Sequence, residues 1–401
     1  MEYAQGKVNT SQVFLAFLKL GLTSFGGPVA HIGYFRTEFV ERRGWVTEEE
    51  FAQLLATSQF LPGPASSQLG FSIGLLKAGW LGALAAFVAF TLPSVMLLVA
   101  FAALLPILAG DLGQAIIHGL KLVACIVVAD AVISMAKSLC PDWATRSIAA
   151  ASIVTLILLT TAFAQLVVIA IAALIGAVFL TKHSQTTIAK PVSVSYGTGL
   201  GWVLLTCFVL LLVSLPLLAS SQPDLVSIAD AFYRAGALVF GGGHVVLPLL
   251  DESVVSSGWL SAEQFLAGYG AAQAIPGPMF AFSAYLGSLI GAEDSSWTFA
   301  TVATLFMFLP GFLLMAGVLP FWRYLSQSSR AAGIIRAVNA AVVGLLAAAL
   351  YDPIFTSGIT AASDAVIALI GFAILFKWRV SPLIIVVFCV SAILLRMLLL
   401  T

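Results

Sequence analysis

The sequence predicts an all-α polytopic membrane protein with two inverted-topology repeats, built on re-entrant or broken helices and joined by an extra transmembrane helix. Three observations predict this fold class. The 401 residues are 61% hydrophobic and 9% charged, whereas a soluble domain has about 25% charged residues. Apolar runs long enough to cross about 30 Å of hydrocarbon recur along the chain. Blocks of the first half also return in the second half, in hydrophobic segments interrupted by glycine and proline, which is typical of transporters.

The clearest repeated block is Pro62-Gly63-Pro64, which returns 214 residues later as Pro276-Gly277-Pro278. Upstream of it, Phe25-Gly26-Gly27 returns 215 residues later as Phe240-Gly241-Gly242. One inserted residue between two repeated blocks is what a diverged duplication leaves behind. We refer to the first pair as the PGP bends and to the second pair as the FGG breaks.

The repeats divide the chain into three parts. Residues 1–182 form the first predicted transmembrane repeat, residues 183–224 a linker with one extra transmembrane helix at about 199–219, and residues 225–401 the second, inverted repeat. The other expected full spans are 80–106, 113–136, 145–161 and 165–180 in the first repeat, and 296–319, 333–350, 361–376 and 382–400 in the second.

Basic residues change sides between the two halves. The segment before the first PGP bend carries Arg36, Arg42 and Arg43, whereas the matching stretch 251–263 has no lysine or arginine. Conversely, residues 105–115 have no basic residue, while their counterpart in the second half has three. Cytoplasmic loops of membrane proteins are enriched in lysine and arginine. We therefore expect two halves of opposite orientation in an inner membrane, with the N-terminus in the cytoplasm.

Composition also excludes several classes of protein. The formal net charge is zero, so no basic surface for nucleic acid is expected. The four cysteines and four histidines are too sparse and too scattered for a disulfide framework or a metal site, and no cofactor motif is present. Residues 1–11 are polar and lack the apolar core of a cleaved signal peptide.

The charge pattern predicts that each PGP bend is the apex of a re-entrant hairpin. Arg43 and Lys77 both belong to the cytoplasmic side, so the chain between them enters and leaves on one face. The FGG breaks fit the same interpretation. Backbone groups freed at such breaks must be buried in protein or line a watery cavity. The alternative is that every arm spans the membrane fully, which gives roughly thirteen crossings of about 20 residues each.

A helix that restarts after a break points unpaired N–H groups and the positive end of its dipole into the cavity, which is suited to an anion. The candidate substrate-binding residues are Gly26, Gly27, Pro28, His31, Pro62, Gly63, Pro64, Ser66, Ser67, Gln68, Gly241, Gly242, Gly243, His244, Pro276, Gly277, Pro278 and Ser283. Structural roles remain open for these residues: the glycines could let helices pack closely, the serines could cap helices, and the histidines could be structural donors.

Five further residues are candidates for charge balance or coupling. Lys19 and Arg234 occupy equivalent places before the two FGG breaks, where ionisable groups among apolar residues are functional, paired or reaching the interface. Lys121 lies in an apolar run, and its second-half counterpart is Asn339. Asp130 is expected to pair with one of these cations or to bind a proton.

Long segments of the sequence resemble the chromate ion transporter family, in its long form with two fused repeats. The similar segments are FLKLGLTSFGGPVAHI, RRGWVTEEEFAQLLATSQFLPGPASSQLG, FGGGHVVLPLL and AQAIPGP. The family's marked segments map onto 25–28, 44–45, 62–64, 240–243 and 276–278. The resemblance implies a bacterial inner-membrane protein that exports chromate and so gives chromate resistance. Sulfate has the same shape and charge as chromate, so it remains an alternative substrate.

We expect a secondary transporter and no enzyme. Moving two negative charges out of a cell that is negative inside is downhill by about 4.6 kcal/mol per 100 mV, and coupling to protons or sulfate stays open. No ATP-binding motif is present. The expected partners are chromate or sulfate and the lipid bilayer, and the chain could form a homodimer. The alternatives are a carrier of another oxyanion, a lipid-phosphate scramblase or carrier, and an intramembrane hydrolase that uses Ser66 or Ser67 with His31.

Overall fold

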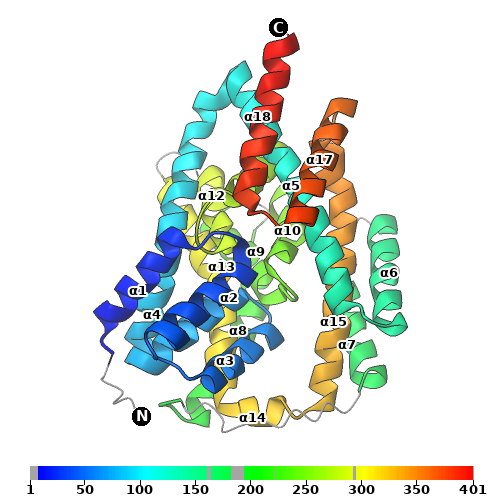
Figure 1. The fold of residues 1–401 in the computed structure, drawn as a ribbon. Coiled ribbons are helices and arrows are strands. Elements are labelled where there is room, and N and C mark those ends of the chain that lie inside the picture. Colours follow the sequence, from blue (N-terminus) through cyan, green and yellow to red (C-terminus); the bar gives the residue numbers. More distant parts are fainter. Residues whose placement is uncertain (1–7, 160–163, 182–193, 221, 292–294, 401) are drawn as a thin grey trace.

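The computed structural model describes residues 8–159, 164–181, 194–220, 222–291 and 295–400, and every regular element in this part is a helix (Figure 1). The helices are α1 (Thr10–Thr23), α2 (Gly27–Arg36), α3 (Glu48–Phe60), α4 (Ala65–Leu104), α5 (Asp111–Leu139), α6 (Trp143–Leu158), α7 (Ala164–Phe179), α8 (Thr198–Leu218), α9 (Leu225–Leu238), α10 (Val246–Leu250), α11 (Ala262–Ala272), α12 (Phe282–Ile290), α13 (Ser296–Val318), α14 (Trp322–Leu325), α15 (Ser329–Ala349), α16 (Thr356–Gly358), α17 (Ala362–Trp378) and α18 (Pro382–Leu400). Short 3-10 and π segments connect them, among them η1 (Thr37–Arg42), η3 (Gly243–Val245), η4 (Asp251–Val255), η5 (Met279–Ala281) and η8 (Leu350–Phe355).

The prediction of an all-α polytopic membrane protein is confirmed. Six helical segments in the described part are long and apolar enough to cross a membrane. These segments are Ala65–Leu108, Asp111–Leu139, Thr198–Leu218, Ser296–Phe321, Ser329–Gly358 and Pro382–Leu399. The expected spans at 145–161 and 165–180 correspond to α6 and α7, which have 16 residues each. At a rise of 1.5 Å per residue each is about 24 Å long, slightly less than the hydrocarbon thickness.

The long helix α4 is really two arms. Its helical dihedral angles are interrupted at Ala78 and Gly79, and Gly74 and Gly82 on either side of the interruption lie in contact with each other. The chain therefore reverses at this point. The first arm, residues 65–77, follows the first PGP bend, and the second arm is the expected span that begins near residue 80.

The arms around each PGP bend are short. The first bend lies between α3, with 13 residues, and the first arm of α4. The second bend lies between α11, with 11 residues, and the segment formed by η5 and α12. Helices of 11 to 13 residues are about 16 to 20 Å long, which is too short to cross 30 Å of hydrocarbon. These lengths favour re-entrant arms over full spans.

Most of the described helices surround one apolar core, and the C-terminal helices add a second. α4 packs on α1, α13 on α9 and α12, and α15 on α6 and α7 (Figure 1). The smaller core lies where α17 and α18 pack on α5. The extra helix α8 packs on α9 and α13 with only Gly201 and Leu215 buried, so most of its apolar side chains face outward, as expected for a peripheral membrane helix.

Candidate functional site

The two PGP bends each form a hydrogen bond to the FGG break of the other half. The backbone N–H of Gly63 donates to the carbonyl oxygen of Val239 at 2.7 Å, and that of Gly277 donates to the carbonyl oxygen of Ser24 at 2.8 Å. Ser24 and Val239 are equivalent residues, because each immediately precedes an FGG break. The φ angles of Gly63 and Gly277 are +121° and +93°, a region that side chains other than glycine rarely adopt. The glycine in each bend is therefore needed for this reciprocal pairing.

Each PGP bend also contacts the proline-containing long helix of the other half. The hydroxyl of Ser94, next to Pro93 in α4, donates to the carbonyl oxygen of Pro276 at 2.6 Å. In the opposite direction, the side-chain amide of Gln68 donates to the carbonyl oxygen of Gly311, next to Pro310 in α13, at 3.0 Å. Thus the two bends are anchored at matching positions of the two halves.

The FGG breaks lie next to each other as well. A Cβ atom added to Gly243 would lie 3.3 Å from the Pro28 side chain, which follows the first break, and 2.8 Å from the Met279 side chain, which follows the second PGP bend. The glycine and proline candidates from both halves therefore form one neighbourhood where four helix breaks meet. At these breaks Pro64, Gly243 and Gly277 are buried, whereas Gly26 and Gly241 are exposed.

The candidate histidines sit at the breaks with different partners. The Nε2–H of His31 donates to the carbonyl oxygen of Ser24 at 3.2 Å, since a carbonyl oxygen can only accept. His244 lies with Nδ1 2.6 Å from the hydroxyl of Tyr269 on α11. His31 is fully buried, so both rings are fixed parts of the breaks.

The candidate serines differ in whether their hydroxyl groups are used. Ser283 donates to the carbonyl oxygen of Phe280 at 2.8 Å. The hydroxyl of Ser67 is buried without a hydrogen-bond partner, as is the side-chain oxygen of Gln68. Ser66 is 4% exposed. The first PGP bend is thus followed by two buried polar atoms without a hydrogen-bond partner, Oγ of Ser67 and Oε1 of Gln68.

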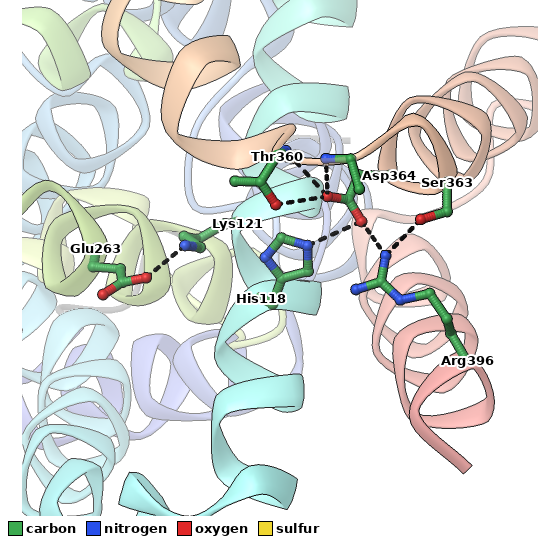
Figure 2. A network of polar contacts seen from close by, with 8 residues as sticks. His118, Lys121, Glu263, Thr360, Ser363, Asp364 and Arg396 are labelled. Carbon is green, nitrogen blue, oxygen red and sulfur yellow. Dashed lines mark hydrogen bonds and ion pairs between the residues drawn. The ribbon is translucent and has the colours of Figure 1, made fainter. Parts of the chain in front are cut away.

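Three of the coupling candidates form ion pairs with acidic side chains. Lys19 lies 3.8 Å from Glu38, and Arg234 lies 2.7 Å from Asp230 one helical turn away. Lys121, on α5, lies 2.7 Å from Glu263 at the start of α11 (Figure 2). The ion pairs offset the unfavourable free energy of placing cations among apolar residues.

The expected pairing of Asp130 with one of these cations is not observed. Asp130 lies 3.6 Å from Arg379, in the connection between α17 and α18. The two residues are close because Asp130 is on α5 and Arg379 is at the C-terminal end of α17, which packs on α5. Asn339 has a buried side-chain oxygen without a partner, 3.6 Å from a Cβ atom added to Gly241. Asn339 is therefore close to the second FGG break, whereas Asp130 is not joined to either break.

Glu38, in the π-helical segment η1 that follows α2, is a charge centre that the sequence did not reveal. Its carboxylate accepts hydrogen bonds from Arg43 at 2.6 Å and from Arg42 at 3.2 Å, and it also faces Lys19. Burial alone would raise the pKa of Glu38, but the hydrogen bond from Arg43 and the three positive charges outweigh it and lower the pKa. Glu38 thus supplies one negative charge to a cluster of three cations on α1, η1 and the end of η1.

A second unexpected network joins α5 to the C-terminal helices (Figure 2). Asp364 is fully buried and accepts from the Thr360 hydroxyl at 3.0 Å and from Arg396. His118 lies 3.0 Å from the same carboxylate and one helical turn from Lys121. A buried carboxylate is tolerated because cations and N–H groups surround it.

A cavity in the described part of the chain is lined by no residue of the PGP bends or the FGG breaks. It has a volume of about 370 Å³ between α6, α7, α10, η4, α15 and η8. Its charged lining residues are Asp251, Glu252 and Asp352. Three carboxylates repel an anion, so this cavity does not suit the substrate predicted from the sequence.

Comparison with known proteins identifies the family. The chromate transporter family model matches residues 11–177 and 226–395. The chain belongs to the chromate transporter family. Membership in this family supports a role in chromate transport, and the two matched stretches contain all of the helix breaks described above.

Relatives extend over nearly the full chain of this chromate transporter family member. A probable chromate transport protein of Synechococcus elongatus is 29% identical over 94% of this chain and 93% of its own length. The chromate transport protein of Pseudomonas aeruginosa is 26% identical over 92% of this chain and 87% of its own. An uncharacterized transporter of Methanocaldococcus jannaschii is 25% identical over 96% and 89%. No solved structure matches the chain.

Proposed function

We propose that the protein is a secondary transporter that exports chromate, a tetrahedral oxyanion, across the bacterial inner membrane and so gives chromate resistance. Family membership supports the substrate. The observation that carries the mechanism is the reciprocal bonding of Gly63 to Val239 and of Gly277 to Ser24. This bonding joins helix breaks from the two halves, and transporters built from such repeats bind their substrates where the repeats meet.

In this proposal residues 1–182 and 225–401 are two inverted repeats, and residues 183–224 link them through α8. The N-terminus lies in the cytoplasm. The repeats move against each other and expose the site to one side of the membrane at a time. Backbone N–H groups and hydroxyls at the four breaks hold the anion, and the paired cations Lys19, Arg234 and Lys121 balance charge nearby.

The membrane potential is sufficient to drive export. A dianion that leaves a cell with a negative interior gains about 4.6 kcal/mol per 100 mV. A site made mainly of neutral donors suits such a cycle because it releases the anion more readily than a cluster of lysines would.

Inside-out membrane vesicles test the proposal. With an interior-positive potential imposed, vesicles that contain the protein should accumulate chromate above the level of vesicles without it. Replacing Pro62 and Pro64 by alanine should abolish this accumulation while the protein still inserts. If chromate does not accumulate under any imposed potential or pH gradient, the proposal fails. Accumulation of labelled sulfate but not chromate would identify a carrier of another oxyanion, and chromate-insensitive movement of a fluorescent phospholipid would identify a scramblase.

A further inference from the structure

Five polar side chains of the described part are at most 4% exposed and still hold an oxygen or nitrogen without a hydrogen-bond partner. They are Ser24, His31, Ser67, Gln68 and Thr91. Buried polar atoms are nearly always satisfied, so each exception requires an explanation. All five lie in the first half, on α1 to α4 or at the breaks between them.

The second half has apolar residues at every matching position. The FGG breaks are 215 residues apart, the PGP bends 214, and the mid-helix prolines Pro93 and Pro310 are 217 apart. With the offset of the nearest of these features, the counterparts of the five residues are Val239, Val246, Ala281, Phe282 and Phe308. The most deeply buried of the unpartnered groups near the breaks therefore come from the first half, and the partly buried Asn339 adds one beside the second FGG break. Packing alone does not require this difference, because the apolar counterparts fill equivalent positions in the same fold.

Other buried hydroxyls of the helices do find partners. Ser72, Ser152 and Thr304 each donate to the carbonyl oxygen four residues earlier, at 2.7 to 2.8 Å. Such back-bonding is the usual way to satisfy a hydroxyl in a membrane helix. The unpartnered hydroxyls of Ser24 and Thr91 are therefore exceptional.

Ser24, His31 and the helix that bears Thr91 meet at the second PGP bend. The carbonyl oxygen of Ser24 accepts from Gly277 and from His31. The ring of His31 lies edge-on to the ring of Phe90, with centroids 5.3 Å apart. The carbonyl oxygen of Phe90, the residue before Thr91, lies 3.2 Å from a Cβ atom added to Gly277.

The tautomer of His31 determines what its free nitrogen can do. Because Nε2 donates its hydrogen to the Ser24 carbonyl oxygen, the neutral ring has no hydrogen on Nδ1. Nδ1 is therefore an acceptor, and it has no donor. A fully ionised oxyanion has only acceptor oxygens and cannot satisfy it. A singly protonated oxyanion has one O–H group that can donate to Nδ1 and three oxygens that can accept from hydroxyls.

No hydrogen bond or ion pair to a charged side chain supplies that missing proton in the described part of the chain. The charged and titratable groups on the elements around His31 are Lys19 on α1, Tyr34 and Arg36 on α2, Lys77 on α4, and, beyond Pro28, His244 and Tyr269. Lys19 is paired with Glu38, Arg36 with Glu41 and Glu48, and His244 with Tyr269. The second PGP bend has no titratable side chain.

We infer that the substrate binds as its singly protonated monoanion, with its O–H group donating to Nδ1 of His31 and with Ser24 and Thr91 donating to its other oxygens. The inference rests on the proposed function and deepens it. Each transported ion then carries one proton and one net negative charge, so the membrane potential acts on half of the charge that was taken for the dianion above. Hydrogen chromate is a weak acid that is partly protonated near neutral pH, whereas sulfate is fully ionised there. The same site therefore prefers chromate to sulfate although the two dianions have equal shape and charge.

Proteoliposomes with the full chain and chromate as the probe test the inference without any variant. At zero membrane potential, an imposed pH gradient should concentrate chromate on the alkaline side by about tenfold per pH unit, because one proton moves with each ion. A tenfold excess of sulfate should compete only weakly. If potential moves chromate but a pH gradient does not, or if sulfate competes as well as chromate, the inference is wrong and the proposed function stands. If neither gradient moves chromate, the proposed function itself fails.

Variants separate binding from structure. His31→Gln should transport chromate faster than His31→Phe, because its amide group can still donate to Ser24 and accept from the substrate. His31→Phe should raise the KM for chromate at least tenfold, the loss expected for one hydrogen bond to a charged ligand. Thr91→Val should raise the KM severalfold, whereas the matched control Thr304→Val, whose hydroxyl bonds only within its own helix, should not. Equal KM values for His31→Phe and the unchanged protein would overturn the assignment.

Discussion

The ammonium group of Lys121 lies 2.7 Å from a carboxylate oxygen of Glu263 and joins the long helix α5 to the short helix α11. The Lys121 side chain is 7% exposed and that of Glu263 is 61% exposed. Glu263 begins α11, which crosses α5 in backbone contact between Gly270 and Leu120 and then leads to the second PGP bend. The ion pair therefore holds the arm that positions this bend.

Removing only the carboxylate of this pair should lower the free energy of unfolding more than removing both charges does. Glu263→Gln leaves the buried ammonium of Lys121 without a counter-charge, which should lower the free energy of unfolding by about 1–3 kcal/mol. The double variant Lys121→Met, Glu263→Gln should recover part of this loss. Thermal unfolding in detergent measures both. The control is Glu49→Gln at the exposed equivalent position of the first half, which should change stability by no more than about 0.5 kcal/mol. Equal losses for the single and double variants would contradict the role of the pair.

Adding one methyl group at the PGP bends should stop transport. Gly63→Ala forces a side chain into a left-handed conformation, at a cost of about 1–2 kcal/mol, and places Cβ 2.9 Å from Gln68 and 3.0 Å from Gly311. We expect at least a tenfold lower rate of chromate uptake into inside-out vesicles at an unchanged amount of inserted protein. Gly44→Ala also adds a methyl group at a positive φ angle, +58°, but with no atom within 4 Å of it, so it shows the effect of a methyl group that meets no neighbour. Normal uptake by Gly63→Ala would show that the bend tolerates repacking.

The sequence allowed the helix breaks to be predicted because they depend on local chemistry. Glycine and proline interrupt helices wherever they occur in this pattern, and Pro62-Gly63-Pro64 and its repeat mark such interruptions without any tertiary information. The extra helix at 199–219 was also predictable from local sequence, because an uninterrupted apolar run of about 20 residues is long enough to cross a membrane. That run is α8.

The side-chain partners could not be predicted, because they depend on how distant helices pack. The bond from Gln68 to Gly311 joins residues 243 positions apart, and Asp130 pairs with Arg379 instead of with a cation near the breaks. Glu38 and Asp364 looked like ordinary loop and helix-start residues in the sequence, and only the fold shows that they are buried charge centres. The unpartnered hydroxyls of Ser24 and Thr91 are visible only when every neighbour has been placed.

The network around Asp364 should hold the C-terminal helices in place. Asp364→Ala removes the acceptor for Thr360 and Arg396 and leaves the arginine half-buried without its carboxylate. Breaking such a pair should lower the free energy of unfolding by about 3 kcal/mol or more. Limited proteolysis and thermal unfolding should show that α17 and α18 are released before the rest of the protein. The comparison variant Ser363→Ala, which loses one exposed hydrogen bond to Arg396, should change little. A single, unshifted transition in Asp364→Ala would contradict this function of the network.

The charge centre at Glu38 should make stability depend on pH in a defined direction. Its pKa is lowered in the folded protein from the ordinary value of 4.5, so the folded state favours the ionised carboxylate. The stabilisation is complete above the ordinary pKa and disappears as the pH falls through the lower, folded-state pKa. At pH 7, Glu38→Gln should lower the free energy of unfolding by about 2 kcal/mol. The difference in melting temperature between Glu38→Gln and the unchanged protein should be constant from pH 7 to about pH 5 and should shrink below it. Glu41→Gln, which removes an exposed ion pair with Arg36, should cost at most about 1 kcal/mol. A difference for Glu38→Gln that grew on acidification would mean that the neutral form of Glu38 is the one the fold prefers.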